Sequence, residues 1–120
     1  MSLLNLVGKE MVQHTIKQIG EMIRKNKSLD EKNKAQLLYL LSTLKPEIEK
    51  LSKVQAEHKE SVAGFMERST HEALRKEKNP TLLKLAIDAL SASVKGFEAS
   101  HPKLVENVNC IAIELANIGI

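Results

Sequence analysis

The stretch that decides the fold reads "NPTLLKLAIDALSASVKGFEASHPKLVENVNCIAIELANIGI" and runs from residue 79 to residue 120. Asn79 before Pro80 predicts the start of a helix, because asparagine caps the first turn and proline fits the first helical position. Pro102 marks a second start, and it keeps His101 out of the helical region, which ends the preceding helix. Apolar residues recur at helical spacing after both signals. The stretch therefore predicts two helices joined by a corner.

The first of these two helices has a wide apolar arc and a narrow polar face. The arc consists of Leu82, Leu83, Ala86, Ile87, Leu90, Val94 and Phe97. The polar face consists of Lys84, Asp88, Ser91, Lys95 and Glu98. So wide an apolar arc predicts burial on more than one side of the helix.

The last helix has its apolar stripe on one side, and two residues of interest lie on the other. The stripe consists of Leu104, Val108, Ile111, Leu115 and Ile118. At about 100° per residue, Ile113 falls on the opposite face, with Cys110 about 60° from it. Either another helix covers these two residues or a second copy of the protein does. Met11 and Met22, on the flank of the first helix, form a second candidate protein interface.

The front of the chain keeps the same helical spacing. An apolar stripe predicts a first helix that ends near Asn26; it consists of Val12, Ile16, Ile19 and Ile23. Ser28 with Glu31 matches a capping box, which predicts the start of a second helix. The apolar stripe of that helix continues past Pro46. Either the helix kinks there, or it breaks and restarts with Ser42 or Thr43 as cap; the unbroken stripe favours a kink.

The middle of the chain, residues 53–78, has the weakest apolar pattern. Its stripe is thin and consists of Val62, Phe65, Met66, Ala73 and Leu74. Polar residues dominate elsewhere in the segment. We expect a helix that packs shallowly and is the most mobile part of the protein.

These elements predict an all-α fold. A chain of 120 residues fits one domain, and five glycines and three prolines leave few places for the turns of a many-stranded sheet. We expect a single domain, residues 1–120, that forms an antiparallel bundle of four to five helices. Residues 1–52 form a first hairpin, residues 53–78 a long middle helix, and residues 79–120 a C-terminal hairpin.

Composition also bears on location and partners. The single cysteine excludes an internal disulfide framework. No basic residue precedes the short apolar run at the amino terminus, so the pattern of a signal peptide is missing. No apolar run approaches the roughly 20 residues that span a bilayer. We expect a cytoplasmic protein that does not insert into a membrane.

The net charge is +3, with the signs interspersed. One local basic excess predicts a candidate anion-binding stretch, formed by Arg24, Lys25, Lys27, Lys32 and Lys34. The alternative is that the first three of these cations stabilise the negative end of a helix dipole. Few arginines and only three aromatic residues favour this alternative, and nucleic acid is not the expected partner.

Glu98 and His101 are the strongest candidates for chemistry. A general acid–base pair or a metal site needs a third group and a sheltered cleft. The sequence shows neither a third ligand at suitable spacing nor an HExxH motif. Pro102 accounts for the local pattern as a helix corner. We therefore predict no catalytic residue, no metal site and no cofactor.

The remaining histidines and the cysteine lead to the same prediction. His14 one turn from Glu10, and His71 one turn from Glu67, could each supply half of a metal site. Exposed surface histidines explain them more simply. Cys110 has no CxxC partner, and no glycine-rich phosphate loop occurs.

Two segments of the tail resemble a known family. "FEASHPKL" and "VENVNCIAIELANIGI" resemble the F-E-x-x-H-P-x-L and L-x-N-M/I-G-I patterns of a family of short bacterial proteins called domain of unknown function 4404. The matching positions are Phe97, Glu98, His101, Pro102, Leu104, Leu115, Asn117, Ile118, Gly119 and Ile120. The resemblance covers roughly residues 12–52 and 79–120. It implies bacterial origin and a small helical protein, and it brings no activity, cofactor or catalytic residue.

Taken together, the sequence predicts a non-enzymatic cytoplasmic protein that acts as a protein–protein interaction or scaffold module and that can form a homodimer. Its expected partner is a protein, including a second copy of itself. The alternative is a nucleic-acid or anionic-surface binder that uses the basic stretch from Arg24 to Lys34.

Overall fold

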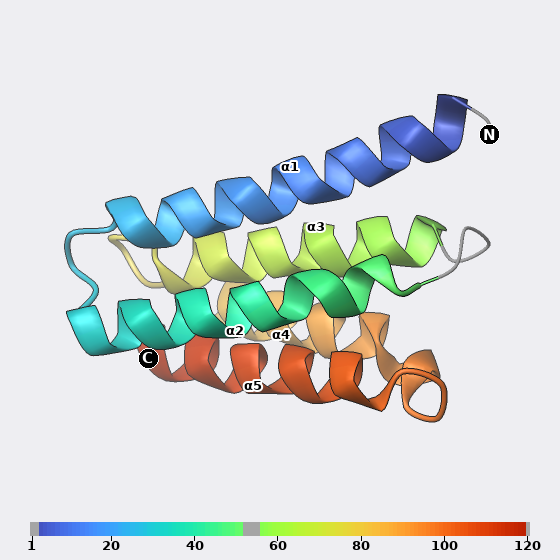
Figure 1. Cartoon of the computed structure of the whole chain (residues 1–120). Coiled ribbons are helices and arrows are strands. Elements are labelled where there is room, and N and C mark those ends of the chain that lie inside the picture. The colour runs from blue at the N-terminus through green and yellow to red at the C-terminus, as the bar shows by residue number, and fades with distance from the viewer. Residues whose placement is uncertain (1–2, 52–55, 120) are drawn as a thin grey trace.

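The computed structural model describes residues 3–51 and 56–119, and within them the side chains of residues 11–51 and 57–119. This part of the chain is helical, without a strand, which confirms the predicted all-α bundle (Figure 1). The elements are α1 (Leu3–Lys25), α2 (Glu31–Glu49), α3 (Ala56–Ala73), α4 (Pro80–Ser93), the 3₁₀ turn η2 (Lys95–Phe97) and α5 (Pro102–Ile118).

Successive helices alternate in direction, so that α1, α3 and α5 run one way while α2 and α4 run the other (Figure 1). The most extensive contacts join α1 with α3, α3 with α4, and α2 with α5. The contact between α1 and α2 is less extensive, although these helices are adjacent in the sequence. The first helix therefore packs mainly on a parallel neighbour, α3, and only partly on its antiparallel hairpin partner.

The loop between α1 and α2 differs from the predicted capping box. Asp30 is the N-cap of α2, and its Oδ1 accepts a hydrogen bond from the backbone N–H of Asn33 at 2.7 Å. Ser28 stands two residues earlier, where its N–H donates to Asn26 Oδ1 at 3.0 Å. The same Asn26 oxygen also accepts the N–H of Leu29 at 2.9 Å. Asn26 thus folds the loop into a turn that includes Ser28, and the prediction that Ser28 caps the helix is wrong.

α2 runs without a break through Pro46 to Glu49, which excludes the predicted alternative of a restarted helix. Pro46 is exposed, so its ring adds no clash inside the core. Leu44 before it and Ile48 after it are both buried. The unbroken apolar stripe, from which a continuous helix was predicted, is therefore the buried face of α2.

α3 lies at the centre of the bundle, in contact with α1, α4 and α5. Most of its buried residues are small or polar: they are Val62, Ala63, Met66, Ser69, Thr70, Glu72 and Ala73. Small side chains let neighbouring helices approach closely, so a central helix needs few large apolar residues. The prediction that this segment packs shallowly is wrong; that it is the most mobile segment stays a prediction.

The C-terminal hairpin follows the sequence signals closely. Asn79 caps α4, with its Oδ1 accepting the N–H of Leu82 at 3.1 Å, and Pro80 opens the helix. Pro102 opens α5, while His101 occupies the N-cap position without a side-chain hydrogen bond. Gly119 ends α5, as its N–H donates to the Leu115 carbonyl oxygen at 3.0 Å.

Gly119 also sits where no larger residue fits. A methyl group added there would overlap the Leu83 side chain and would lie 3.4 Å from the Cα of Ala73. The end of α5 therefore closes against both α3 and α4, and this approach needs the missing side chain.

Candidate functional site

The outward side of α4 is apolar. Leu85 is 60% exposed and Leu82 is 37% exposed, while Ala92 is exposed and Ala89 is half-buried. These four residues fall within an arc of about 80° around the helix, and we call them the α4 face. Most of the predicted apolar arc is buried against α3 and α5: Leu83, Ala86, Leu90, Val94 and Phe97 are in the core and Ile87 packs against it, while Leu82 is partly exposed. Leu85 belonged to neither the predicted arc nor the predicted polar face.

A charged pair borders the α4 face. Lys84 Nζ lies 2.8 Å from Asp88 Oδ2, one turn along the helix. The hydrogen bond to Asp88, together with its negative charge, raises the pKa of Lys84 above its ordinary value. Both side chains of the pair are exposed to solvent, so the pair contributes little to stability. It forms the polar edge of the α4 face.

The predicted interface on α5 consists of one isolated apolar residue. Ile113 is 62% exposed and Cys110 is exposed, so no other described helix covers them. Glu106, Asn109 and Asn117 are the exposed residues around them. Single exposed apolar residues are common on protein surfaces and indicate no interface by themselves.

The predicted surface on α1 is also discontinuous. Met11 is 56% exposed, whereas Met22 is half-buried and packs against the core. Met22 borders a groove that also contains Glu67 of α3. The two methionines share a helix face, but only Met11 has the exposure that a docking surface needs.

The basic stretch does not form a single patch. Arg24 faces the groove between α1 and α2, whereas Lys25 faces the groove between α1 and α3, beside Glu21 and Glu67. Lys27 and Lys32 are exposed.

The fifth cation of the stretch has a structural role at the end of α1. Lys34 Nζ donates to the carbonyl oxygen of Arg24 at 3.3 Å and lies 3.8 Å from Glu31 Oε1. Lys34 of the next helix thus binds the negative end of the α1 dipole. Arg24 and Lys25 stand in the last turn of α1, as the alternative interpretation of the basic stretch predicted, whereas Lys27 lies beyond the helix end.

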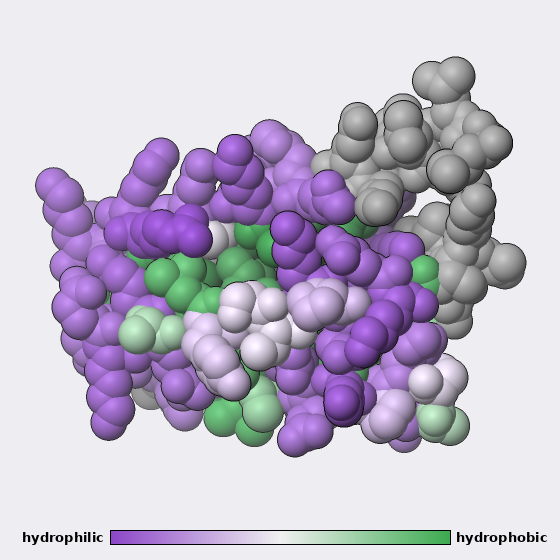
Figure 2. All heavy atoms as spheres, in the orientation of Figure 1, coloured by the Kyte–Doolittle hydropathy of each residue, from purple (hydrophilic) through white to green (hydrophobic). Residues whose placement is uncertain are grey.

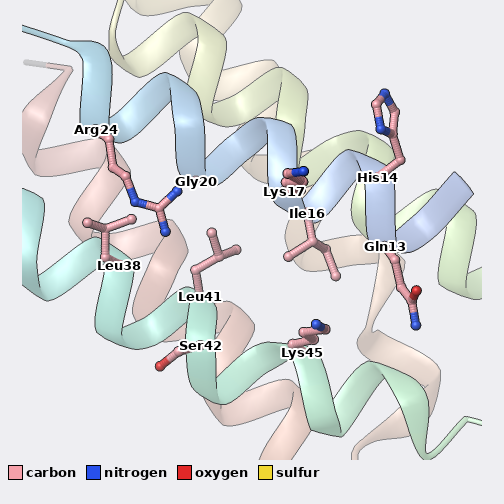
Figure 3. Close-up of a pocket in the computed structure, with 10 residues that line it drawn as sticks. All are labelled: Gln13, His14, Ile16, Lys17, Gly20, Arg24, Leu38, Leu41, Ser42 and Lys45. Atoms are coloured by element: carbon pink, nitrogen blue, oxygen red, sulfur yellow. The ribbon is translucent and has the colours of Figure 1, made fainter. Parts of the chain in front are cut away.

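A groove of about 510 Å³ lies between α1 and α2 (Figure 3). Ile16, Leu38 and Leu41 lie along its bottom, and the cations at its edges are Lys17, Arg24 and Lys45, with His14 beyond them. None of the residues that line it is acidic. Figure 2 shows apolar atoms in the hollow between these two helices, with hydrophilic side chains on both sides.

Gly20 shapes this groove. It lies inside α1 and is buried, and a methyl group added there would lie 3.3 Å from Arg24 Nη1 and 3.5 Å from Leu41 Cδ2. Glycine inside a helix costs about 1 kcal/mol relative to alanine. Its presence lets the Arg24 guanidinium fold back along the helix toward Leu41, into the groove.

Sequence reasoning missed Lys17 and Lys45 at this groove. Lys17 and Arg24 stand two helical turns apart, a spacing that was readable in the sequence. Lys45 belongs to α2, and only the crossing of the two helices brings it to the same groove.

The corner at Glu98 and His101 has the geometry of a structural element. Phe97 is buried, and the His101 ring meets it edge-on with centroids 5.9 Å apart. His58 of α3 meets the same ring at 5.4 Å. Glu98 is exposed, and within the part of the chain that the structure describes no three His, Cys, Asp or Glu side chains gather as a metal site would require.

The helices of the described residues are too short or too polar to cross a bilayer.

The fold and these surfaces define the class of the protein as a small helical bundle whose notable surface features are the apolar α4 face and a cationic groove. A family model described as "Domain of unknown function (DUF4404)" matches residues 37–120, more than half of the chain, and the chain belongs to this family. No curated protein and no solved structure matches the chain.

The matched region refines the resemblance seen in the sequence. It includes residues 53–78, which the sequence comparison had left out, and it begins after residues 12–36, which that comparison had included. α3 is therefore part of the family's fold, and α1 lies outside the matched region.

The motif positions of the tail have mainly structural places. Phe97, Leu104 and Leu115 are buried in the core, and Pro102 opens α5. Gly119 fits against α3 and α4. Ile120 lies outside the described residues. The motif residues thus form the corner between α4 and α5 and the contact of the C-terminal end of α5 with α3 and α4.

Proposed function

We propose that this protein is a non-enzymatic interaction module that associates with a second copy of itself through the α4 face. The observation that supports this proposal is the exposure of Leu82 and Leu85 on one side of a helix whose other side is core. Two such faces packed together would remove both leucines from water, and a fully buried leucine side chain contributes about 1.5–3 kcal/mol.

The arrangement of charge on α4 is compatible with a two-fold contact. In a symmetric pair each residue of the face meets the same face of the partner. α4 helices crossing antiparallel would bring the Lys84–Asp88 edge of one copy beside the same edge of the other. Opposite signs one turn apart would then alternate across the contact, so that like charges need not face each other.

The size of the contact limits its strength. The α4 face spans about three turns of one helix, so a contact made by this face alone would fall at the small end of specific interfaces. We therefore propose a reversible dimer that depends on protein concentration. We also propose that the protein is cytoplasmic and that it acts there as a scaffold.

The test is the molar mass in solution, measured by analytical ultracentrifugation over a wide range of protein concentration. We expect wild type to shift toward a dimer as concentration rises and Leu85→Lys to remain a monomer. Leu85 is largely exposed, so at concentrations where wild type is a monomer this substitution should leave the melting temperature nearly unchanged.

Ile113→Lys is the matched control, because it makes the same kind of change at an equally exposed residue of another helix. We expect it to dimerise as wild type does. A wild-type protein that stays monomeric up to millimolar concentration contradicts the proposal, and a dimer that is lost only in Ile113→Lys assigns the contact to α5 instead.

A further inference from the structure

We infer that the groove between α1 and α2 binds an acidic amphipathic helix of a partner protein. The groove differs from the α4 face in position and in chemistry, so this inference does not depend on self-association. It is carried by the spacing of three cations around an apolar bottom.

The cations of the groove have no ionic partner among the side chains that the structure describes. The ion pairs found in residues 11–51 and 57–119 involve Lys34, Lys50, Arg75 and Lys84. Lys17, Arg24 and Lys45 are all exposed, and none of them appears in such a pair. Three cations with no acid among the lining residues create a positive potential that attracts an anionic ligand.

The positions of the cations define the shape of that ligand. Lys17 and Arg24 are on the same face of α1, and the Arg24 guanidinium folds back beside Gly20, three residues or about 4.5 Å along the helix axis from Lys17. Lys45, on α2, lies across from the Lys17 end of the groove (Figure 3). A complementary ligand therefore carries negative charge at two places about one helical turn apart.

Between these charges the bottom of the groove is apolar. Leu38 is half-buried, while Ile16 and Leu41 are nearly covered by their own chain. An inorganic phosphate would leave this apolar part unused, and a fatty-acid anion has charge at one end only. An amphipathic helix with two acidic residues one turn apart beside a row of leucines meets both requirements, and helix-in-groove docking is a common mode of peptide recognition.

The packing of the bundle leaves room for such a helix. α1 contacts α3 more extensively than α2, so the α1–α2 seam is the less closed side of α1. Gly20 lies in this seam and allows Arg24 to lie along the helix toward Leu41. A bound helix would add a neighbour along the less extensive of the contacts of α1 with α2 and α3.

The probe for the test is a synthetic, fluorescently labelled helix of about 15 residues, long enough for a measurable helical population. It carries two glutamates four residues apart beside a leucine row, and a matched peptide has glutamine at both positions. Anisotropy titration with the full chain is expected to show binding of the glutamate peptide, weakened by rising salt and reduced about tenfold for the glutamine peptide.

Two protein variants with equal charge change locate the site. Arg24→Glu should weaken binding of the glutamate peptide about tenfold or more, because it replaces an attraction by a repulsion. Lys32→Glu makes the same charge change at an exposed residue outside the groove lining and should change binding less than about twofold. Leu85→Lys should bind the peptide as wild type does, which separates this test from that of the α4 face.

Three outcomes would overturn the inference. The first is no binding of the glutamate peptide by the folded wild type. The second is equal weakening by Arg24→Glu and Lys32→Glu, which would show attraction by net charge alone. The third is that decanoate or inorganic phosphate binds in an Arg24-dependent way while the peptide does not, which would make the groove a site for a small anion.

Discussion

α3 and α4 pack against each other, and they use their side chains in opposite ways. α3 is rich in charged and hydroxyl residues, yet Ser69, Thr70 and Glu72 are buried in it. α4 is rich in leucine, yet Leu82 and Leu85 are exposed. The difference shows that the place of a helix in the bundle decides its burial: α3 has three helical neighbours, α1, α4 and α5, whereas α4 has two, α3 and α5.

The largest expected effect comes from truncating one large residue on each helix. Met66→Ala in α3 removes a side chain that is buried in the core, and it should lower the free energy of unfolding by about 2–5 kcal/mol. Leu85→Ala in α4 should change it by less than about 0.5 kcal/mol, because this side chain is largely in water. Urea denaturation of both variants measures the difference; equal losses would contradict the central position of α3.

Glycine substitutions sharpen the same comparison. Gly119→Ala places a methyl group against Leu83 of α4 and Ala73 of α3, and overpacking of this kind should cost about 1–3 kcal/mol. Gly64→Ala, on the exposed side of α3 with open space around it, should stabilise the protein by about 0.5–1 kcal/mol through helix propensity. Thermal melts of the two variants should therefore shift in opposite directions. A stabilising Gly119→Ala would show that α5 does not end in contact with α3 and α4.

Two ion pairs give the smallest expected difference. Arg75 Nη1 lies 2.8 Å from Oε1 of Glu72, a carboxylate that is buried on α3. Arg75→Ala would leave that carboxylate buried without its partner, at a cost of about 1–3 kcal/mol. Lys84→Ala breaks an exposed pair on α4 and should cost less than about 0.5 kcal/mol. Chemical denaturation at neutral pH compares them, and an equal cost would mean that the Glu72 carboxylate reaches water.

The sequence was informative wherever local chemistry decides structure. Asn79 with Pro80, and Pro102, mark helix starts that depend only on neighbouring residues, and the structure has both starts. The exception is Ser28: Asp30 caps α2 instead, and Ser28 lies in a turn where Asn26 Oδ1 accepts its N–H. Local signals thus predict the elements well and their ends less well.

The sequence was less informative about surfaces, because surfaces depend on which helices meet. The opposite orientation of Ile113 followed from helical spacing alone and is confirmed. The exposure of Leu85 could not be foreseen, because it requires that no element covers that side of α4. Lys17 and Lys45 line the same groove only because α1 and α2 pack side by side. The periodicity of one helix carries no information about which helix it packs against.

The parallel contact of α1 with α3 bears on the order of folding. Antiparallel neighbours such as α3 with α4, or α4 with α5, meet across short loops, whereas the contact of α1 with α3 closes a loop that contains the whole of α2. Closing a longer loop costs more chain entropy, so the α3–α5 segment should form the folding nucleus and α1 should dock late. Truncations of Ile16 or Ile19 should then accelerate unfolding while leaving the refolding rate nearly unchanged.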